Sequence, residues 1–354
     1  MKETKHFVFL DGLRGIAAIV VVIFHLFESI YQKQHVNLFA HGFLAVDFFF
    51  CLSGFVIAYA YDDRVGKLGY LPFIKRRLIR LHPLVILGSV LGLAIYLFDP
   101  WANYSISWNP VLIVTAYFQS NVLIPTTIPV SNRYGNLFPF NPPSWSLSLE
   151  YLANIIYILI LVRLPRKGLI LIFSCSLLVL IYLAHKFGTL SGGWHSETLI
   201  VGIARMSFSF LAGLIIKRYS IRIKDKANPI FVMILLLVAL AMPYLKYNWL
   251  VEVFIVTVLF PTIIALAAGV QISNKLKYTA DILGRLSYPL YITHYWFITI
   301  LSNYCKIYQL NNVTALLVIL TATCGLILLA YVALRFYDEP LRKWLNKKLV
   351  RYTN

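Results

Sequence analysis

Ten apolar runs constrain this chain more than any other feature of its sequence, because each is long enough to cross a lipid bilayer as a helix. A spanning helix needs about 20 predominantly apolar residues. The runs cover residues 7–30, 42–61, 78–98, 143–162, 168–185, 198–216, 228–245, 249–270, 280–302 and 312–334. We therefore expect an all-α fold, a polytopic membrane protein of about ten transmembrane helices.

Composition points the same way. Of the 354 residues, 60% are hydrophobic and 13% are charged, whereas soluble domains carry nearer a quarter charged residues. A chain this apolar cannot hide its surface from water by folding on itself. The first run, 7–30, is too long for a signal-peptide core and lacks a small-x-small cleavage site, so we expect it to be retained. The stretch Val111–Gln119 is too short to cross and is expected to be a re-entrant segment or a loop helix.

The lysines and arginines predict the orientation of the spans. If the N-terminus is cytoplasmic, 25 of the 32 basic residues lie in segments on that side and 5 lie on the other. The remaining two, Arg14 and Arg205, lie within spans. Cytoplasmic loops are enriched in Lys and Arg, so we expect both termini to be cytoplasmic. The net charge of +18 then reflects these loops rather than a nucleic-acid surface.

The chain is expected to form a single membrane-embedded domain over residues 1–354, with no separate soluble domain. Its largest piece outside the membrane is the predicted outer loop 99–142. The cysteines show no CxxC or metal-like spacing, so neither a disulfide framework nor a metal site is indicated. They are Cys51, Cys175, Cys305 and Cys324.

The first predicted helix carries ionisable residues on one face. Arg14 and His25 lie eleven residues apart, which brings them within about 20° of alignment and separates them by about 16 Å along the axis. Asp11, three residues before Arg14, can pair with it. Ionisable groups in a span are costly and by default indicate function. We expect Arg14 in the inner half of this face and His25 in the outer half.

Titratable residues from four spans are predicted to converge at one depth near the outer surface. Helical rise places His25 and Asp47 about 8 Å below that surface, Glu150 about 10 Å and His294 about 13 Å. A histidine with carboxylates in a low-dielectric pocket is equipped for general acid–base catalysis. The catalytic candidates are His25, Glu150 and Asp47, and the sequence leaves open which carboxylate is the partner of His25.

Structural roles are the alternative for some of these residues. Asp47 or Arg14 could form an interhelical ion pair, and His294, which lies among tyrosines, could be a packing histidine. Arg205 has no partner that the sequence identifies.

Basic residues also gather at the start of the third span, where Lys75, Arg76, Arg77 and Arg80 lie. Arg77 and Arg80 are one turn apart and share a face. With Arg14 they could bind a phosphate-bearing ligand from the cytoplasm, since guanidinium suits phosphate oxygens. Anchoring at the inner surface is the alternative, and it explains Lys75 and Arg76 fully.

These residues lie in strings that resemble, in the same order, the motifs of membrane acyltransferase family 3. The strings are Leu10–His25 (an arginine, ten residues, then a histidine), Val46–Ile57, Arg76–Pro83, Pro143–Glu150, Gly284–His294 and Phe336–Pro340. The resemblance therefore covers nearly the whole chain. By position, Arg14 and His25 match the family's essential pair, Arg77 and Arg80 its second arginine motif, and Glu150 its acidic residue.

The resemblance implies an integral-membrane O-acyltransferase of the bacterial inner membrane. Such enzymes move an acyl group, usually acetyl, from cytoplasmic acyl-CoA to a hydroxyl, usually of a carbohydrate such as lipopolysaccharide or another cell-surface polysaccharide. Acyl-CoA is then a donor substrate and no cofactor is permanently bound. Expected partners are the acceptor, membrane lipid and polysaccharide-biosynthesis proteins, with no nucleic acid. The expected substrate-binding residues are Asp11, Arg14, Arg77, Arg80, Trp145, Ser146, Asn154, Tyr291 and His294.

The sequence departs from the family's pattern in places. Tyr151 follows Glu150 where many members have a second acid, and Asn154, one turn on, shares the face of Glu150 instead. The residue before Pro83 is His82, where other members often have an aromatic residue. We expect no extra outer hydrolase-like domain, which favours direct transfer or a separate partner protein.

The predicted mechanism joins the two groups of residues. The CoA phosphates bind Arg77 and Arg80, with Arg14 deeper, and the pantetheine arm carries the thioester to the level of His25. His25 takes the proton of the acceptor hydroxyl as a general base, and Glu150 or Asp47 orients its imidazole.

Two other readings stay open. An acyl-enzyme could form through Ser53, Ser146 or Ser287, although no GxSxG elbow supports it. A proton-coupled transporter or flippase of a polysaccharide or lipid-linked sugar would also need membrane carboxylates and histidines, but it would not need the inner arginines.

Overall fold

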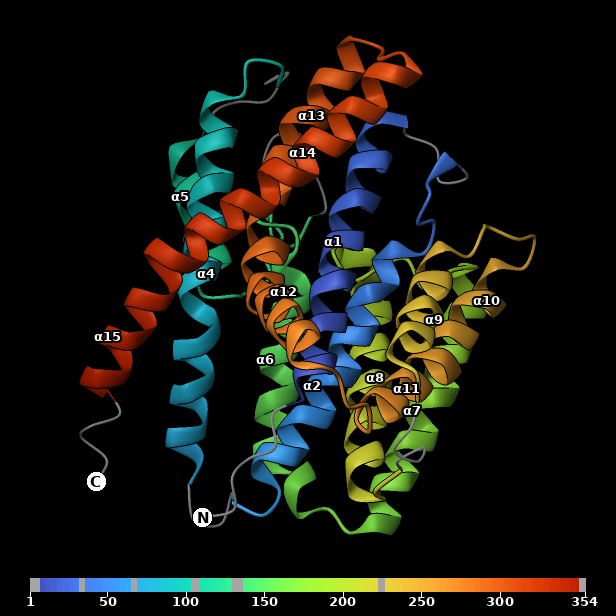
Figure 1. The fold of residues 1–354 in the computed structure, drawn as a ribbon. Helices are drawn as coiled ribbons and strands as arrows, with labels where there is room; N and C mark the ends of the chain where they lie inside the picture. The colour runs from blue at the N-terminus through green and yellow to red at the C-terminus, as the bar shows by residue number, and fades with distance from the viewer. Residues whose placement is uncertain are drawn as a thin grey trace.

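The computed structural model describes residues 7–31, 36–64, 69–102, 109–128, 136–221 and 227–349. These residues form a bundle of helices (Figure 1), and their only extended pairing is an isolated bridge between Asn136 and His195. The all-α prediction is confirmed. The chain termini, whose side of the membrane the charges predict, lie outside the described residues, as do 103–108 and 129–135 of the predicted loop 99–142.

The helices follow one another along the whole chain. Those of the first half are α1 (Val8–Tyr31), η2 (Gly42–Leu44), α2 (Ala45–Tyr61), α4 (Tyr70–Phe98), α5 (Pro110–Asn121), α6 (Ser144–Leu159), η3 (Leu161–Arg163) and α7 (Arg166–Phe187). Those of the second half are η4 (Ser196–Thr198), α8 (Leu199–Arg218), α9 (Pro229–Ala241), α10 (Asn248–Phe254), η5 (Ile255–Leu259), α11 (Phe260–Ala267), α12 (Asn274–Thr293), α13 (Tyr295–Ile307), α14 (Asn312–Val332), η6 (Ala333–Asp338) and α15 (Glu339–Leu349).

Seven helical segments of the described residues are long and apolar enough to cross a membrane, so the chain is a multi-pass membrane protein. They are Val8–Tyr31, Gly42–Tyr61, Tyr70–Phe98, Arg166–Phe187, Ser196–Arg218, Asn248–Ala267 and Asn312–Leu349. The other predicted runs correspond to α6, to the short apolar α9, and to α12 with α13. The apolar stretch Val111–Gln119 lies in the helix α5.

The predicted continuous span 280–302 is wrong in one respect, because the helix breaks at His294. Pro289 lies one turn before the break and cannot donate a backbone hydrogen bond. The Thr293 hydroxyl donates to the Pro289 carbonyl at 2.7 Å, and the His294 ring bonds to nearby carbonyls. These side chains satisfy backbone groups that a break inside a membrane would otherwise leave unpaired.

Two helix pairs make the closest contacts at the centre of the bundle, α1 with α12 and α2 with α8. Glycine makes this approach possible. A Cβ atom added at Gly15 of α1 would lie 2.5 Å from the Leu283 backbone, and one at Gly54 of α2 would lie 2.1 Å from the Phe210 carbonyl oxygen. Small residues let helix backbones pack this closely in membranes. These contacts set how each helix is rotated against its neighbour.

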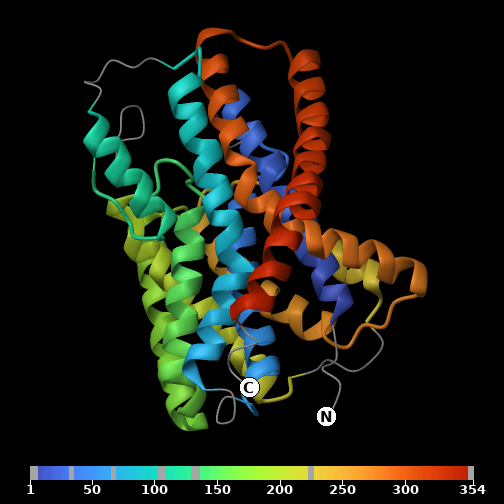
Figure 2. The ribbon, with the colours of Figure 1, turned by 90° about the vertical axis from the view of Figure 1, so that its left-hand side faces the viewer.

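The last helices form a long, bent rod, which Figure 2 shows in red. The bend falls at η6, a π-helical segment between α14 and α15, followed by Pro340. The Tyr337 hydroxyl donates to the Pro83 carbonyl of α4 at 3.1 Å. This contact holds η6 and α15 beside α4, where Asp338 and Arg342 reach the interior.

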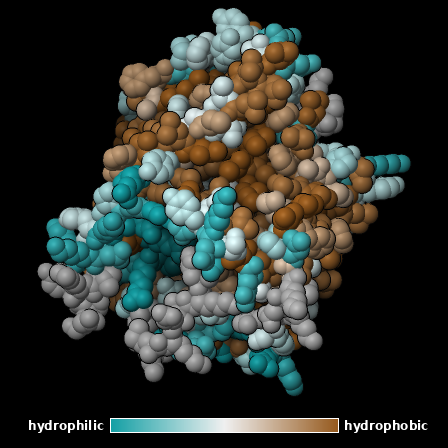
Figure 3. Space-filling view, viewed as in Figure 1, coloured by the Kyte–Doolittle hydropathy of each residue, from teal (hydrophilic) through white to brown (hydrophobic). Residues whose placement is uncertain are grey.

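The surface suits a lipid environment. Large apolar side chains are exposed on the outer helices, for example Leu171, Leu178 and Tyr182 on α7 and Leu328 on α14. Figure 3 shows hydrophobic residues over much of one face, and a hydrophilic hollow at the lower left, where α15 lies in Figure 1. The helices therefore combine a lipid-facing exterior with a hydrophilic hollow on this face.

Candidate active site

Two cavities lie one above the other along α1. The lower cavity, of about 370 Å³, takes Asp11 and Arg14 from the first turns of α1. The upper cavity, of about 390 Å³, takes His25 and Glu28 from the last turns. Eleven residues of helix separate Arg14 from His25, which is about 16 Å along the axis. Arg14 and His25 thus lie on one continuous helix and each lines one of the two cavities, while the predicted inner and outer depths stay a prediction.

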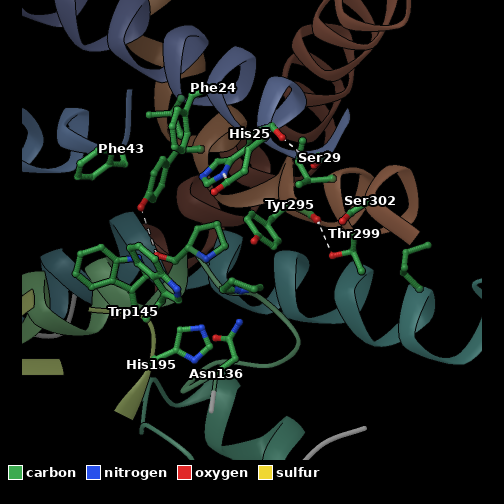
Figure 4. Close-up of a pocket in the computed structure, with 18 of the residues that line it drawn as sticks. Phe24, His25, Ser29, Phe43, Asn136, Trp145, His195, Tyr295, Thr299 and Ser302 are labelled. Carbon is green, nitrogen blue, oxygen red and sulfur yellow. Dashed lines mark hydrogen bonds and ion pairs between the residues drawn. The ribbon is translucent and has the colours of Figure 1, made fainter. Parts of the chain in front are cut away.

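The upper cavity has polar and aromatic walls (Figure 4). His25 of α1 lies on one side of it, and His195 and Asn136 lie on the other, with Tyr295 and Trp145 between them. The last turns of α4, the start of α6 and α13 complete the walls. The Trp145 and Trp194 rings pack edge to face, 6.3 Å apart.

His25 meets a carboxylate that the sequence interpretation did not consider. Its Nδ1 lies 3.0 Å from Oε2 of Glu28, three residues further along α1. The predicted pairing of His25 with Glu150 or Asp47 is wrong, because both of those carboxylates bind arginines elsewhere. The sequence contains a signal for this pair, because Glu28 follows His25 by three residues and residues three apart on a helix share a face.

His294 lies beside His25, as the shared depth predicted. The two rings stack with centroids 5.6 Å apart and an interplanar angle of 24°. Nδ1 of His294 lies 2.8 Å from the Tyr291 carbonyl oxygen, and an N–H there donates to it. His294 is fully buried and lines neither cavity. Its ring packs against the His25 ring, next to the break between α12 and α13.

The lower cavity gathers the predicted arginines. Arg14 pairs with Asp11 at 3.1 Å, as predicted. Its guanidinium also donates to the Ser287 hydroxyl at 2.8 Å and to the Gly284 carbonyl at 2.7 Å. These contacts fix Arg14 against α12 with part of its surface toward the cavity.

Glu150 belongs to the lower cavity and not to the level of His25. Its Oε1 accepts hydrogen bonds from Arg77 at 2.7 Å and from Ser53 at 2.9 Å. Arg80 lines the same cavity with an exposed side chain. Arg14, Arg77, Arg285 and Arg342 each have a carboxylate partner, whereas Arg80 has none among the described residues. Its positive charge is therefore available to an anionic ligand.

Asp47 and Arg205 form a fully buried ion pair, which corrects two predictions. Arg205 Nη2 lies 2.6 Å from Asp47 Oδ2, and both side chains are 0% exposed. Arg205 also donates to the carbonyls of Gly192 and Phe43. Asp47 is therefore not a partner of His25, and Arg205, for which the sequence suggested no partner, has one. Ionisable side chains within membrane helices typically pair with one another or with backbone carbonyls, as Arg205 and Asp47 do.

The remaining predicted residues divide between the two cavities and the core. Trp145 lines the upper cavity, Ser146 lines the lower one, and Tyr291 lines both. Asn154 is buried and lines neither. The serines considered for an acyl-enzyme bind other groups than histidine: Ser53 donates to Glu150, Ser146 bonds to Tyr291, and Ser287 accepts from Arg14.

A protein family described as an acyltransferase domain matches residues 7–335. Protein 2 in the picA locus of Rhizobium radiobacter is 31% identical over 192 residues, which cover 52% of this chain and 97% of that protein. The O-acetyltransferase OatA of Staphylococcus aureus is 26% identical across 94% of this chain but only 57% of its own length. This chain thus spans little more than half of OatA. No solved structure matches.

Proposed function

This chain belongs to the acyltransferase family that matches residues 7–335, and on that premise we propose that it is an O-acyltransferase of the bacterial cytoplasmic membrane. It moves an acyl group from cytoplasmic acyl-CoA to a hydroxyl of a carbohydrate on the other side of the membrane. By analogy with OatA this group is acetyl. The family membership favours this enzyme over the proton-coupled transporter or flippase that the sequence alone left open.

The lower cavity is the donor site in this proposal. CoA carries several phosphates, and guanidinium groups match phosphate oxygens in geometry and charge. Among the described residues Arg80 has no carboxylate partner, and Arg14 and Arg77 line the same cavity. The excess of basic residues predicts that the end of the bundle with the lower cavity faces the cytoplasm. This supports the lower cavity as the site of donor binding.

The upper cavity is the acceptor site. Carbohydrates offer apolar ring faces and many hydroxyls, so aromatic side chains with a few polar groups suit them. Trp145, Trp194 and Tyr295 supply the aromatic surface, and Asn136 and Asn303 supply amide groups. This mixture of ring faces and uncharged polar groups supports a sugar as the acceptor.

His25 is the general base. When Glu28 accepts a hydrogen bond from Nδ1–H, the lone pair of the imidazole is on Nε2. Nε2 then takes the proton of the acceptor hydroxyl as its oxygen attacks the thioester carbonyl. The carbon–sulfur bond breaks, and the CoA thiolate takes up the proton from the imidazolium. Glu28 stabilises the imidazolium that forms in between.

One observation carries this proposal: Arg14 and His25 of a single helix each line one of two adjacent cavities, one rich in arginine and one with aromatic and mixed polar walls. A donor and an acceptor that approach from opposite sides need such an arrangement.

The test is an assay of the protein in liposomes with radiolabelled acetyl-CoA and a glycan extract from the cell envelope. We expect label on the glycan, and a mass gain of one acetyl group. His25→Ala should lower the rate by about 10²- to 10⁴-fold, the contribution typical of a general base. The matched control is His185→Ala, because His185 of α7 lines neither cavity. Unchanged transfer by His25→Ala, or a wild-type protein that consumes no acyl-CoA, would contradict the proposal.

A further inference from the structure

Tyr291 lies at the boundary between the two cavities. Among the described residues, Val46 and Tyr291 are the ones that line both the lower and the upper cavity. The consecutive residues Trp145 and Ser146 flank the same boundary, one on each side. These side chains therefore form the boundary between the cavity of the arginines and the cavity of His25.

The Tyr291 side chain is held in place across the boundary. Its hydroxyl lies 2.7 Å from the Ser146 hydroxyl, within hydrogen-bond distance, and both residues are buried. The Phe49 ring packs edge to face against the Tyr291 ring, with centroids 5.7 Å apart. Tyr291 and Ser146 thus connect α12 to α6 between the two cavities.

The backbone around Tyr291 departs from a regular helix. Pro289 precedes Tyr291 by two residues, and α12 ends at Thr293, just before the break at His294. The Tyr291 carbonyl accepts the hydrogen bond from His294, whose ring stacks on His25. Tyr291 is therefore linked through His294 to the ring of the base.

We propose that Tyr291, locked by Ser146, closes the passage between donor and acceptor cavities and determines which acyl groups are transferred. The proposal rests on the proposed function above. The tyrosine ring leaves room at the boundary for a thioester with a short acyl chain and excludes longer chains. It also keeps water of the upper cavity from the thioester until the acceptor is bound.

Failure of this barrier has a defined chemical result. Water then takes the place of the acceptor: its oxygen bonds to the thioester carbonyl carbon, the carbon–sulfur bond breaks, and one proton goes to the CoA thiol. The products are the free carboxylic acid and CoA. Acyl-CoA hydrolysis without acceptor is therefore a direct measure of leakage.

The experiment compares wild type with Tyr291→Ala, Tyr291→Phe and Ser146→Ala in liposomes. Transfer is measured with acetyl-, butyryl- and octanoyl-CoA, and hydrolysis is measured without acceptor. Tyr291→Ala should raise the octanoyl-to-acetyl ratio at least about tenfold, since pockets discriminate single methylene groups by roughly 10- to 200-fold. Tyr291→Phe and Ser146→Ala should each raise hydrolysis by about two- to tenfold, the range that one neutral hydrogen bond is worth.

Tyr182→Ala is the control, because Tyr182 is exposed on α7 and lines neither cavity. Thermal unfolding in detergent checks that each variant folds, and Tyr182→Ala should keep the wild-type chain selectivity and rate of hydrolysis. If Tyr291→Ala is poorly folded, the two mild variants decide the question by hydrolysis. Wild-type chain selectivity and no extra hydrolysis in folded variants would overturn the inference. A wild type that transfers no acyl group would instead overturn the proposed function.

Discussion

The lower and upper cavities have nearly the same volume, about 370 and 390 Å³, but their walls differ in chemistry. The lower cavity is lined by Arg14, Arg77, Arg80, Arg285 and Arg342. The upper cavity has one arginine, Arg205, whose charge is already matched inside the protein by Asp47. The contrast shows that most of the arginines gather in the lower cavity and that the His25–Glu28 pair lies in the upper one, although α1 contributes to both.

The same contrast explains why the two carboxylates near the centre do not serve His25. Glu150 is bound by Arg77 in the lower cavity, and Asp47 is bound by Arg205 in the core. A buried carboxylate is stable only with a nearby cation and full hydrogen bonding. The carboxylate left for His25 is Glu28, which is half-exposed in the upper cavity and has no arginine partner among the described residues.

The largest expected effect comes from breaking the Asp47–Arg205 ion pair at the wall of the upper cavity. Asp47→Asn leaves the Arg205 charge buried and unmatched, so we expect a loss of about 3–5 kcal/mol in stability, as for other broken buried pairs. Arg205 lies over the Trp145 ring at 5.4 Å, so the acceptor KM should also rise. Thermal unfolding in detergent measures the first effect. Asp47→Asn with wild-type stability would contradict a structural role for the pair.

The next effect is confined to the lower cavity. Arg80→Ala should raise the KM for acyl-CoA by about 10- to 150-fold, the value of a hydrogen bond to a charged group, and leave kcat nearly unchanged. The control is Arg335→Ala, because Arg335 pairs with Glu339 at the surface and lines neither cavity. A fall in kcat with no change in KM would mean that Arg80 is not a donor-binding residue.

The smallest effect concerns the upper cavity again. Glu28→Gln keeps the shape of the side chain but removes the charge that stabilises the His25 imidazolium. We expect kcat to fall by about tenfold, the lower end of what mutation of an orienting partner costs, with no change in the KM for acyl-CoA. Steady-state kinetics with varied donor would show this split. A change confined to the donor KM would assign Glu28 to the other cavity.

The sequence predicted well what a single helix determines. The helical period aligns Arg14 with His25 and places Asp11 next to Arg14, and these relations hold in the structure. The apolar runs predicted the all-α membrane fold, and seven helical segments of the described residues meet the requirement for spans. The arginines of α1 and α4 do line one cavity. The first two results depend on spacing along the chain or on helix length, and the third on the depth at which α1 and α4 carry their arginines.

Only the tertiary structure decided which side chains from different helices meet. Depth alone placed Asp47 near His25, but the rotation of α2 turns it toward Arg205, 158 residues away in sequence. Gly54, seven residues after Asp47 and so on the same face, packs its backbone against Phe210 of α8. This contact directs the Asp47 face to α8 and away from α1. The sequence thus determined the spans and the order of residues within them, and helix packing decided the partner of each charge.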